Sequence, residues 1–342
     1  MKPLYKSMLL LGGAMAMMSS CDDFLDRPSE DSYTENSYLS NDKALMNYTF
    51  QIYGPKSWNE YEDKFSWCVG EVYSGNVYHE YGDEGQFHFL TFSNTNAHIQ
   101  NGYTSLYGVI ARCNHILNDV VKVCKENGIS EAAINRAKGE AYMYRGMAYF
   151  LLEEYWGATP IVLNNTEIIN NDKAFDIPLA NRASLYAQIE SDWKQAEKLL
   201  PAEAWGNKGE RVTKWAAKGM LSKLYVTMAS CRADIKGVNK YKCENPEELL
   251  KKAVSLSDEV IAACGSNMAQ GYEAYDLMFR PGTANPEILF ALRMDGGDYG
   301  IGSSRQVQFG RSKFIGCDDD AYGGGKGLTT TLFNSYENGT HV

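Results

Sequence analysis

The residues best suited to ligand chemistry lie in an aromatic segment, residues 54–101. In a short span this segment carries Tyr73, Asn76, Tyr78, Tyr81 and Asp83. Sugar rings stack their apolar C–H faces on aromatic planes, and their hydroxyls pair with amides and carboxylates. We therefore predict that these five residues bind a sugar. The alternative, which the sequence leaves open, is that the tyrosines only pack the segment onto neighbouring helices.

Acidic residues in the same segment raise a catalytic alternative. Glycoside hydrolysis needs two carboxyl groups that face each other across a cleft, roughly 5 to 9.5 Å apart. Four acidic residues lie close together in the sequence: Glu71, Glu80, Asp83 and Glu84. Adjacency alone does not set the required distance. The sequence also has no Gly-x-Ser-x-Gly elbow and no cysteine–histidine signature of a nucleophilic enzyme.

The sequence favours neither a metal nor a nucleotide cofactor. Its five histidines form no paired-ligand spacing such as HExxH. Gly300-Ile301-Gly302 lacks the third glycine of a dinucleotide-binding loop, which would fall at Arg305. The acidic run 318–320, with Asp295 and Asp298, leaves calcium as an open alternative, although no twelve-residue calcium loop surrounds it. We expect no cofactor and no metal.

Composition restricts the partners. The 342 residues carry a formal net charge of −10, which argues against nucleic acid because phosphate binding needs a basic face. Eight cysteines form no C-x-x-C pair, and an odd number remains once Cys21 is set aside. We expect buried free thiols rather than a disulfide framework. Pairing among Cys231, Cys243 and Cys264 stays open.

The N-terminus has the pattern of a bacterial lipoprotein signal. A basic start precedes the apolar run Met8–Met18, which is well short of the ~20 residues that span a bilayer. Two small residues then lead directly to Cys21. We predict that residues 1–20 are a signal peptide, that Cys21 is lipidated, and that residues 21–40 form an acidic tether. An ordinary secretory signal with an incidental cysteine is the alternative.

Most of the remaining chain has the periodicity of amphipathic helices, with apolar residues three and four positions apart. The predicted helices cover residues 42–53, 107–124, 131–156, 185–200, 213–228 and 245–261. In the third, small residues at Ala141, Gly146 and Ala148 would let a neighbouring helix approach closely. Helices joined by short turns favour a mainly α fold of tetratricopeptide-like helix pairs.

Two segments break this periodicity. Residues 54–101 are either an aromatic binding loop or a core layer that the pattern does not reveal. Ala284–Leu292 is predicted to be a short buried strand, and a glycine-rich region follows it. We expect residues 41–342 to form one helical domain that contains the aromatic loop.

Several segments resemble the SusD/RagB family of outer-membrane nutrient-binding lipoproteins. The best is Lys138–Leu163, KGEAYMYRGMAYFLLEEYWGATPIVL, in which Glu140, Ala141, Arg145 and Ala148 fall in register with the family pattern. Five more segments match in order: Cys21–Asp26, Leu106–Leu117, Leu185–Pro201, Arg211–Ala217 and Asn285–Ala291. Each match is weak alone, but six in the family's order form a specific signature.

The resemblance implies SusD-like helix pairs that support an irregular, loop-rich ligand-binding lobe. It implies a binding protein, not an enzyme, that is lipid-anchored at the outer membrane and surface-exposed. Its partners would be an oligosaccharide or polysaccharide and a SusC-like, TonB-dependent transporter. The alternatives are a carbohydrate-active enzyme and a helical-repeat scaffold for protein interactions.

The resemblance also assigns scaffold roles. It places Arg112, Asn114, Glu140 and Arg145 in mid-helix positions, where we expect them to hold helix pairs together. Family members usually continue past the last residues of this sequence, so we expect either that the chain is C-terminally truncated or that the family's final helix pair is absent.

Overall fold

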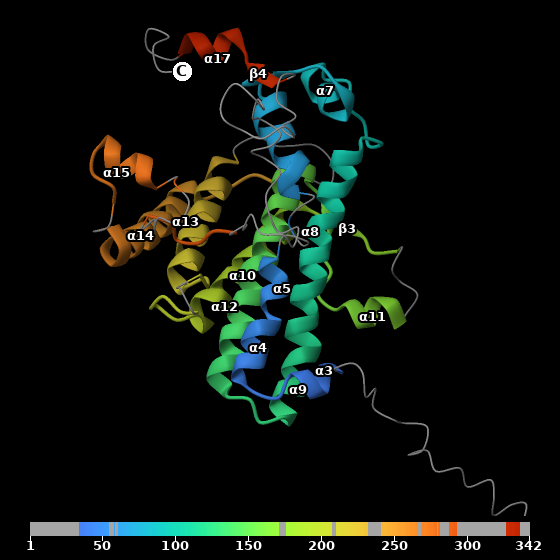
Figure 1. Ribbon diagram of the computed structural model, residues 1–342, viewed down its shortest axis with the longest axis vertical. Coiled ribbons are helices and arrows are strands. Elements are labelled where there is room, and N and C mark those ends of the chain that lie inside the picture. The colour runs from blue at the N-terminus through green and yellow to red at the C-terminus, as the bar shows by residue number, and fades with distance from the viewer. Residues whose placement is uncertain are drawn as a thin grey trace, which may run out of the picture.

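The computed structural model describes residues 34–54, 58, 61–170, 176–206, 210–231, 241–265, 268–278, 280, 287–292 and 326–335. The predicted signal peptide, Cys21 and the tether up to residue 33 lie outside the described residues. Within the described part the chain is mainly helical, as predicted (Figure 1). No helix among these residues is long and apolar enough to cross a membrane.

The first described elements are three short helices, α3 (Glu35–Tyr38), α4 (Asp42–Tyr48) and α5 (Phe50–Tyr53). The predicted helix over 42–53 is thus present, with an interruption at Thr49. Asn41 caps α4 through its side chain, which accepts a hydrogen bond from the Ala44 N–H. This contact satisfies one of the amide groups that a helix leaves free at its start.

Longer helices then pack one against the next. They are α8 (Ala97–His115), α10 (Glu131–Trp156), α12 (Arg182–Leu199), α13 (Lys214–Ser230) and α14 (Pro246–Cys264). A π-helical turn, η3 (Ile116–Val120), continues α8 into α9 (Val121–Glu126). α10 contacts both α8 and α12, α13 contacts both α12 and α14, and the predicted stacking of helix pairs is therefore confirmed (Figure 1).

Short elements complete the described structure. β2 (Thr159–Pro160) pairs with β3 (Leu179–Ala180), and α11 (Asn165–Asn170) lies between them in the sequence. Nearer the C-terminus are α15 (Tyr272–Leu277), β4 (Lys326–Leu328) and α17 (Thr330–Ser335). The strand predicted over 284–292 is wrong for its described residues, 287–292, which form turns and bends. Leu289, Phe290 and Leu292 instead pack on the helical core, so burial explains this apolar run without a strand.

α10 forms the centre of the core because it is buried on most sides. Tyr144, Tyr149 and Ala148 are fully buried on it. The indole of Trp193, on α12, lies against Gly146 and donates a hydrogen bond to the Met143 carbonyl at 3.1 Å. Gly146 thus permits the close approach of α12 to α10, as the small residue at this position predicts.

A buried ion pair crosses the same interface. Arg145 donates from Nε and Nη2 to the two carboxylate oxygens of Asp192, at 2.9 and 2.7 Å, and from Nη1 to Asn114 Oδ1 at 2.9 Å. Asn114 in turn donates to the Val162 carbonyl. One guanidinium thereby connects α8, α10 and α12, which confirms the scaffold roles expected for Arg145 and Asn114.

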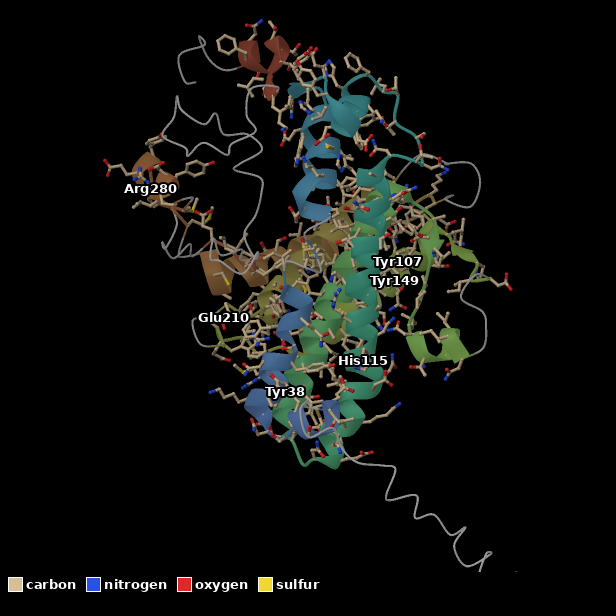
Figure 2. The ribbon with its side chains drawn as sticks, turned by 45° about the vertical axis from the view of Figure 1, so that its right-hand side comes forward. Tyr38, Tyr107, His115, Tyr149, Glu210 and Arg280 are labelled. Atoms are coloured by element: carbon tan, nitrogen blue, oxygen red, sulfur yellow. The ribbon has the colours of Figure 1, made fainter. Side chains whose placement is uncertain are left out.

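The segment after α10 is held to the bundle by tyrosine hydroxyls. Tyr107 donates to the Pro160 carbonyl at 2.7 Å and Tyr149 to the Val162 carbonyl at 2.8 Å. Figure 2 shows the two tyrosines next to each other beside this segment. Their hydrogen bonds satisfy carbonyl groups of a chain that forms only a two-residue ladder.

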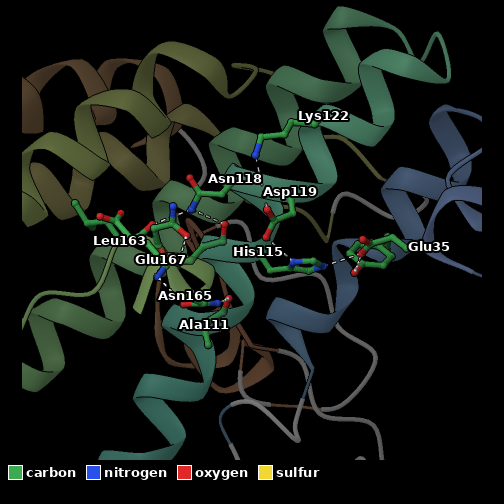
Figure 3. A network of polar contacts seen from close by, with 12 residues as sticks. Glu35, Ala111, His115, Asn118, Asp119, Lys122, Leu163, Asn165 and Glu167 are labelled. Atoms are coloured by element: carbon green, nitrogen blue, oxygen red, sulfur yellow. Dashed lines mark hydrogen bonds and ion pairs between the residues drawn. The ribbon is translucent and has the colours of Figure 1, made fainter. Parts of the chain in front are cut away.

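A histidine connects α3 to α8 (Figure 3). His115 Nε2 lies 2.7 Å from Glu35 Oε1, and its Nδ1 lies 3.0 Å from Asp119 Oδ2. Tyr48 also donates to Glu35. Partial burial opposes protonation of the ring, but the hydrogen bonds to Glu35 and Asp119 outweigh it and raise the pKa of His115.

Replacing Gly146 by alanine should destabilise the protein. A Cβ there would lie 2.6 Å from Trp193 Nε1, and forcing a methyl group into a packed core costs roughly 1–3 kcal/mol. Gly108, in the middle of α8, is the matched control, because its Cβ would meet only the end of the Arg112 side chain at 3.3 Å. Gly108→Ala should stabilise by up to about 1 kcal/mol through helix propensity. Denaturant unfolding measures the change in unfolding free energy of both variants. Equal changes would contradict the close contact between Gly146 and Trp193.

The attachment of α3 should weaken as the pH rises. Since the folded pKa of His115 exceeds its ordinary value of 6.5, its contribution is complete below pH 6.5 and is lost as the pH passes the folded value. Amide hydrogen exchange of α3, corrected for intrinsic rates, should therefore accelerate above that pH. His115→Gln should remove the pH dependence, whereas His88→Gln, on a distant helix, should retain it.

Candidate ligand-binding surface

The aromatic segment folds as a small layer of its own. It contains the π-helices η1 (Tyr61–Phe65) and η2 (Cys68–Tyr73), the strand β1 (Val77–His79) and the helix α7 (Gly82–His88). Its inward side chains form a separate apolar cluster: Trp67, Cys68, Val72, Val77 and Phe87. The segment has no long helix before α8, as predicted. Short helices and a strand form most of the part that was expected to be a loop.

Three of the predicted site residues are exposed on this layer. Exposure of Tyr73 is 50%, of Tyr78 40% and of Tyr81 60%, so their rings are accessible to a ligand. Tyr78 points outward because β1 alternates, with Val77 and His79 facing inward. The sequence left packing and binding open for these tyrosines, and their exposure favours binding.

Two phenylalanines extend this set of rings. Phe89 and Phe92 are also exposed, and we call the five residues Tyr73, Tyr78, Tyr81, Phe89 and Phe92 the aromatic surface. Tyr73 meets Phe92 edge to face at 5.5 Å between ring centroids, and Tyr78 meets His88 at 4.7 Å. Such contacts fix the ring planes in advance of binding.

Glu80 is a polar group beside the aromatic surface and is not among the five predicted sugar-binding residues. Tyr78 donates a hydrogen bond to its carboxylate. Hydrogen bonds from Tyr78 and Tyr81 lower the pKa of Glu80, and the same contacts raise the pKa values of both tyrosines. Tyr78 and Glu80 lie two positions apart, the spacing that puts side chains on one side of an extended chain, and this signal could have found Glu80.

Asn76 and Asp83 are tied into the layer by local hydrogen bonds. Asn76 Nδ2 donates to Glu71 Oε2 at 3.2 Å, and the Asn76 carbonyl accepts from the Thr329 N–H at 3.0 Å. Asp83 Oδ1 accepts from the Gln86 side chain at 2.8 Å. Both residues lie near the tyrosines, as the sequence suggests. Their side chains also hold the layer together through these hydrogen bonds.

A second segment joins the layer from far along the chain. β4 pairs antiparallel with β1, so that Tyr78 lies opposite Gly327 and His79 opposite Lys326. The Lys326 ammonium lies 5.3 Å from the Trp67 ring centroid, and burial together with the nearby Lys64 lowers its pKa. No local sequence pattern indicates this pairing, because strand pairing is non-local and β4 is only three residues long.

Glu80 and Glu84 do not have the properties of a glycosidase acid. That role needs a carboxyl group whose pKa is raised. The His98 ring, whose Nε2 lies 3.5 Å from Glu84 Oε2, and an ion pair with Lys64 at 2.6 Å hold the pKa of Glu84 well below its usual range. The pKa of Glu80 is lowered as well. Both carboxylates are therefore hydrogen-bond acceptors at neutral pH.

The sequence leaves a calcium site and a pairing among three cysteines open. Among the described residues no three histidine, cysteine or acidic side chains are grouped as metal ligands. The acidic run 318–320, Asp295 and Asp298 lie outside these residues. The cysteines of the described part are free thiols, including Cys231, Cys243 and Cys264.

Comparison with known proteins gives the same class of protein as the fold. The family model described as "Starch-binding associating with outer membrane" matches residues 23–226, more than half of the chain. The chain belongs to this SusD-like family. A SusD-like protein of Bacteroides ovatus is 27% identical over 297 residues, which cover 86% of this chain and 50% of that protein. The chain thus spans about half the length of this curated relative.

Solved structures share the fold. A SusD-like protein of Bacteroides fragilis superimposes with a TM-score of 0.65 at 18% identity, over 91% of this chain and 56% of its own. A structure determined with a xylogluco-oligosaccharide gives 0.62 at 22% identity, over 78% and 50%. A laminarin-binding SusD-like protein gives 0.58 at 19% identity, over 79% and 57%.

Asn96 positions the aromatic surface without belonging to it. Its buried side chain caps α8 by accepting from the N–H groups of His98 and Ile99, and it donates to Asp83 O and Gln86 Oε1 on α7, each at 3.0 Å. Every polar group of this amide is used. The residue therefore couples the orientation of α7 to the start of α8.

We expect Asn96→Ala to loosen α7 specifically. Loss of the cap should cost about 0.5–2 kcal/mol of folding free energy. Amide exchange in α7 should accelerate because the Asp83 carbonyl and Gln86 Oε1 on this helix lose their hydrogen-bond donor. Asn41→Ala is the matched control, since it removes an exposed cap from α4. If both variants left α7 equally protected, the coupling through Asn96 would be refuted.

Proposed function

We propose that this chain is a cell-surface lipoprotein that captures oligosaccharides for a SusC-like, TonB-dependent transporter in the outer membrane. The observation that carries the proposal is the aromatic surface, on which the exposed rings of Tyr78 and Tyr81 lie beside the ionised Glu80 and Tyr73 is a third exposed ring. Aromatic planes accept the C–H faces of sugars, and a carboxylate accepts hydroxyl hydrogen bonds.

Family membership supports the type of ligand. The family description names starch binding, and two proteins of the same fold carry a xylogluco-oligosaccharide or the description of laminarin binding. These are different glucans, so their names support a glycan ligand for this chain without choosing among glycans. The choice depends on hydroxyl contacts at the aromatic surface.

The proposed location rests on the N-terminal pattern. A short apolar run, small residues and Cys21 predict acyl chains, and more than one such chain is enough for stable attachment. The following acidic residues would keep the body of the protein away from the lipid surface. The family description, which refers to association with the outer membrane, supports this location.

The state of two carboxylates supports binding without cleavage. Glu80 and Glu84 have lowered pKa values, so each resists the protonation that a general acid requires. We propose that these residues orient the ligand or the surface and transfer no proton. The enzyme alternative is tested by the same experiment as binding.

Tyr78→Ala and Tyr81→Ala should weaken glycan binding. Each ring contributes about 0.5–1.5 kcal/mol when it stacks, which is roughly a two- to tenfold loss of affinity. The protein from residue 22 onward is tested by affinity electrophoresis against plant, host and microbial polysaccharides, with a parallel assay for new reducing ends. Tyr272→Ala, which removes an 81% exposed ring from α15, is the control.

The outcomes separate the hypotheses. Retardation that is lost in Tyr78→Ala and Tyr81→Ala, kept in Tyr272→Ala and free of new reducing ends would establish capture at the aromatic surface. New reducing ends would contradict the binding-protein proposal and indicate an enzyme that cleaves the polysaccharide. Retardation that both tyrosine variants retain would move the ligand to another surface.

A further inference from the structure

Two partly exposed cysteines lie close together where α13 leads into α14. Cys231 directly follows the last residue of α13, and Cys243 lies two positions before Asn245, the cap of α14. The Cys243 N–H donates a hydrogen bond to the Cys231 carbonyl at 2.9 Å. Ordinary bond lengths on either side of this hydrogen bond put the two Cα atoms at most about 6.8 Å apart. Disulfides join Cα atoms that are about 4.4–6.8 Å apart, so the backbone permits a bond between these two residues.

Two tyrosines show that both thiols lie in the same place. The Cys231 sulfur lies 3.6 Å from the Tyr186 hydroxyl. The Tyr186 ring meets the Tyr241 ring edge to face, at 5.2 Å between ring centroids. Burial, followed by the neighbouring thiols of Cys243 and Cys231, raises the pKa of Tyr241 to about 12. Both sulfurs are therefore next to one pair of rings.

The other cysteines of the described part are not placed to compete. Three of them are buried thiols: Cys68, Cys113 and Cys124. Burial raises the pKa values of Cys113 and Cys124, so these thiols resist the ionisation that disulfide exchange requires. Cys264 ends α14, which begins at Pro246, and a helix rises about 1.5 Å per residue, so the two lie roughly 27 Å apart. Of the pairings that the sequence leaves open, the geometry permits only the one at the connection between α13 and α14.

A link at this connection would stabilise the outermost pair of long helices. Figure 1 shows α14 at one edge of the helical stack, and α13 is the long helix that it contacts. α14 is described along its whole length, and Ala253 is its only buried residue. Leu250, Val254 and Ile261 of the same helix are exposed. Because burial holds α14 only weakly, a covalent link near its first turn would contribute to its attachment.

We propose that Cys231 and Cys243 are oxidised to a disulfide that joins the end of α13 to the start of α14. The oxidant is another disulfide. One cysteine thiolate attacks a sulfur of the oxidant, breaks its S–S bond and releases one thiol in forming a mixed disulfide. The second cysteine attacks the protein sulfur of this mixed disulfide and releases the other thiol, so that the protein loses two protons and two electrons and the oxidant gains them. Export of the chain, which belongs to the proposed function, would bring these thiols into an oxidising compartment.

The test uses the reduced full chain, which is incubated with oxidised glutathione under native conditions. After the oxidant is removed, the remaining thiols are alkylated and the protein is digested. Mass spectrometry should find the peptides of Cys231 and Cys243 linked, with the loss of two hydrogen atoms. The oxidised protein should unfold at a Tm roughly 3–6 °C above that of the reduced protein, because the disulfide restricts the unfolded chain.

Serine variants locate the bond. In Cys231→Ser and Cys243→Ser the remaining cysteine of the pair should be alkylated or carry glutathione, and the increase in Tm on oxidation should be lost. Cys264→Ser is the matched control, because it removes another partly exposed cysteine and should leave the linked peptides and the increase in Tm unchanged. Tyr78→Ala should also form the disulfide, so failure of glycan capture and failure of this proposal remain distinguishable.

Three results would overturn the proposal. They are free thiols at positions 231 and 243 after oxidation, a bond from either position to Cys264 or Cys317, and a bond that forms only after denaturation. The measurement on the unsubstituted chain decides between these results and the expected one without any variant. A serine variant that fails to fold therefore does not protect the proposal from refutation.

Discussion

The buried guanidinium of Arg145 is the interaction on which the arrangement of the helices depends. Its two hydrogen bonds to Asp192 fix α12 on α10, and its third reaches Asn114 on α8. A buried ion pair adds little net stability compared with apolar residues, but removing one partner costs about 3–5 kcal/mol. The apolar faces of the three helices would also pack in other registers. We infer that the ion pair acts chiefly by excluding these registers.

Fixing these helices also fixes the aromatic surface. α8 begins at this surface, where Asn96 connects its first turn to α7. α10 carries a second buried acid, Glu140, which accepts hydrogen bonds from Arg211 and Tyr53 in other parts of the chain. The core tolerates the charge of Arg145 because Asp192 and Asn114 satisfy its guanidinium.

The sequence predicts the helices well because their information is local. Ser130 and Asn245 cap α10 and α14 as their types predict, and Gly146 allows the close contact that a small residue suggests. It fails at 287–292, where apolar residues pack on helices without a strand partner. It misses the β1–β4 ladder because three-residue strands, about 250 positions apart, carry almost no periodic signal.

The candidate site is likewise predictable only where its information is local in the sequence. Tyrosines at 73, 78 and 81 can be found from composition, yet only the alternation of β1 decides that Tyr78 faces outward. Asn76 and Asp83 have the right chemistry, but hydrogen bonds to Glu71 and Gln86 engage them. Glu80 accepts a hydrogen bond from Tyr78, and its position two residues after Tyr78 is the sequence signal that distinguishes it from the other three acids. A side chain's type states what it can bind, and its hydrogen-bond partners decide what remains for a ligand.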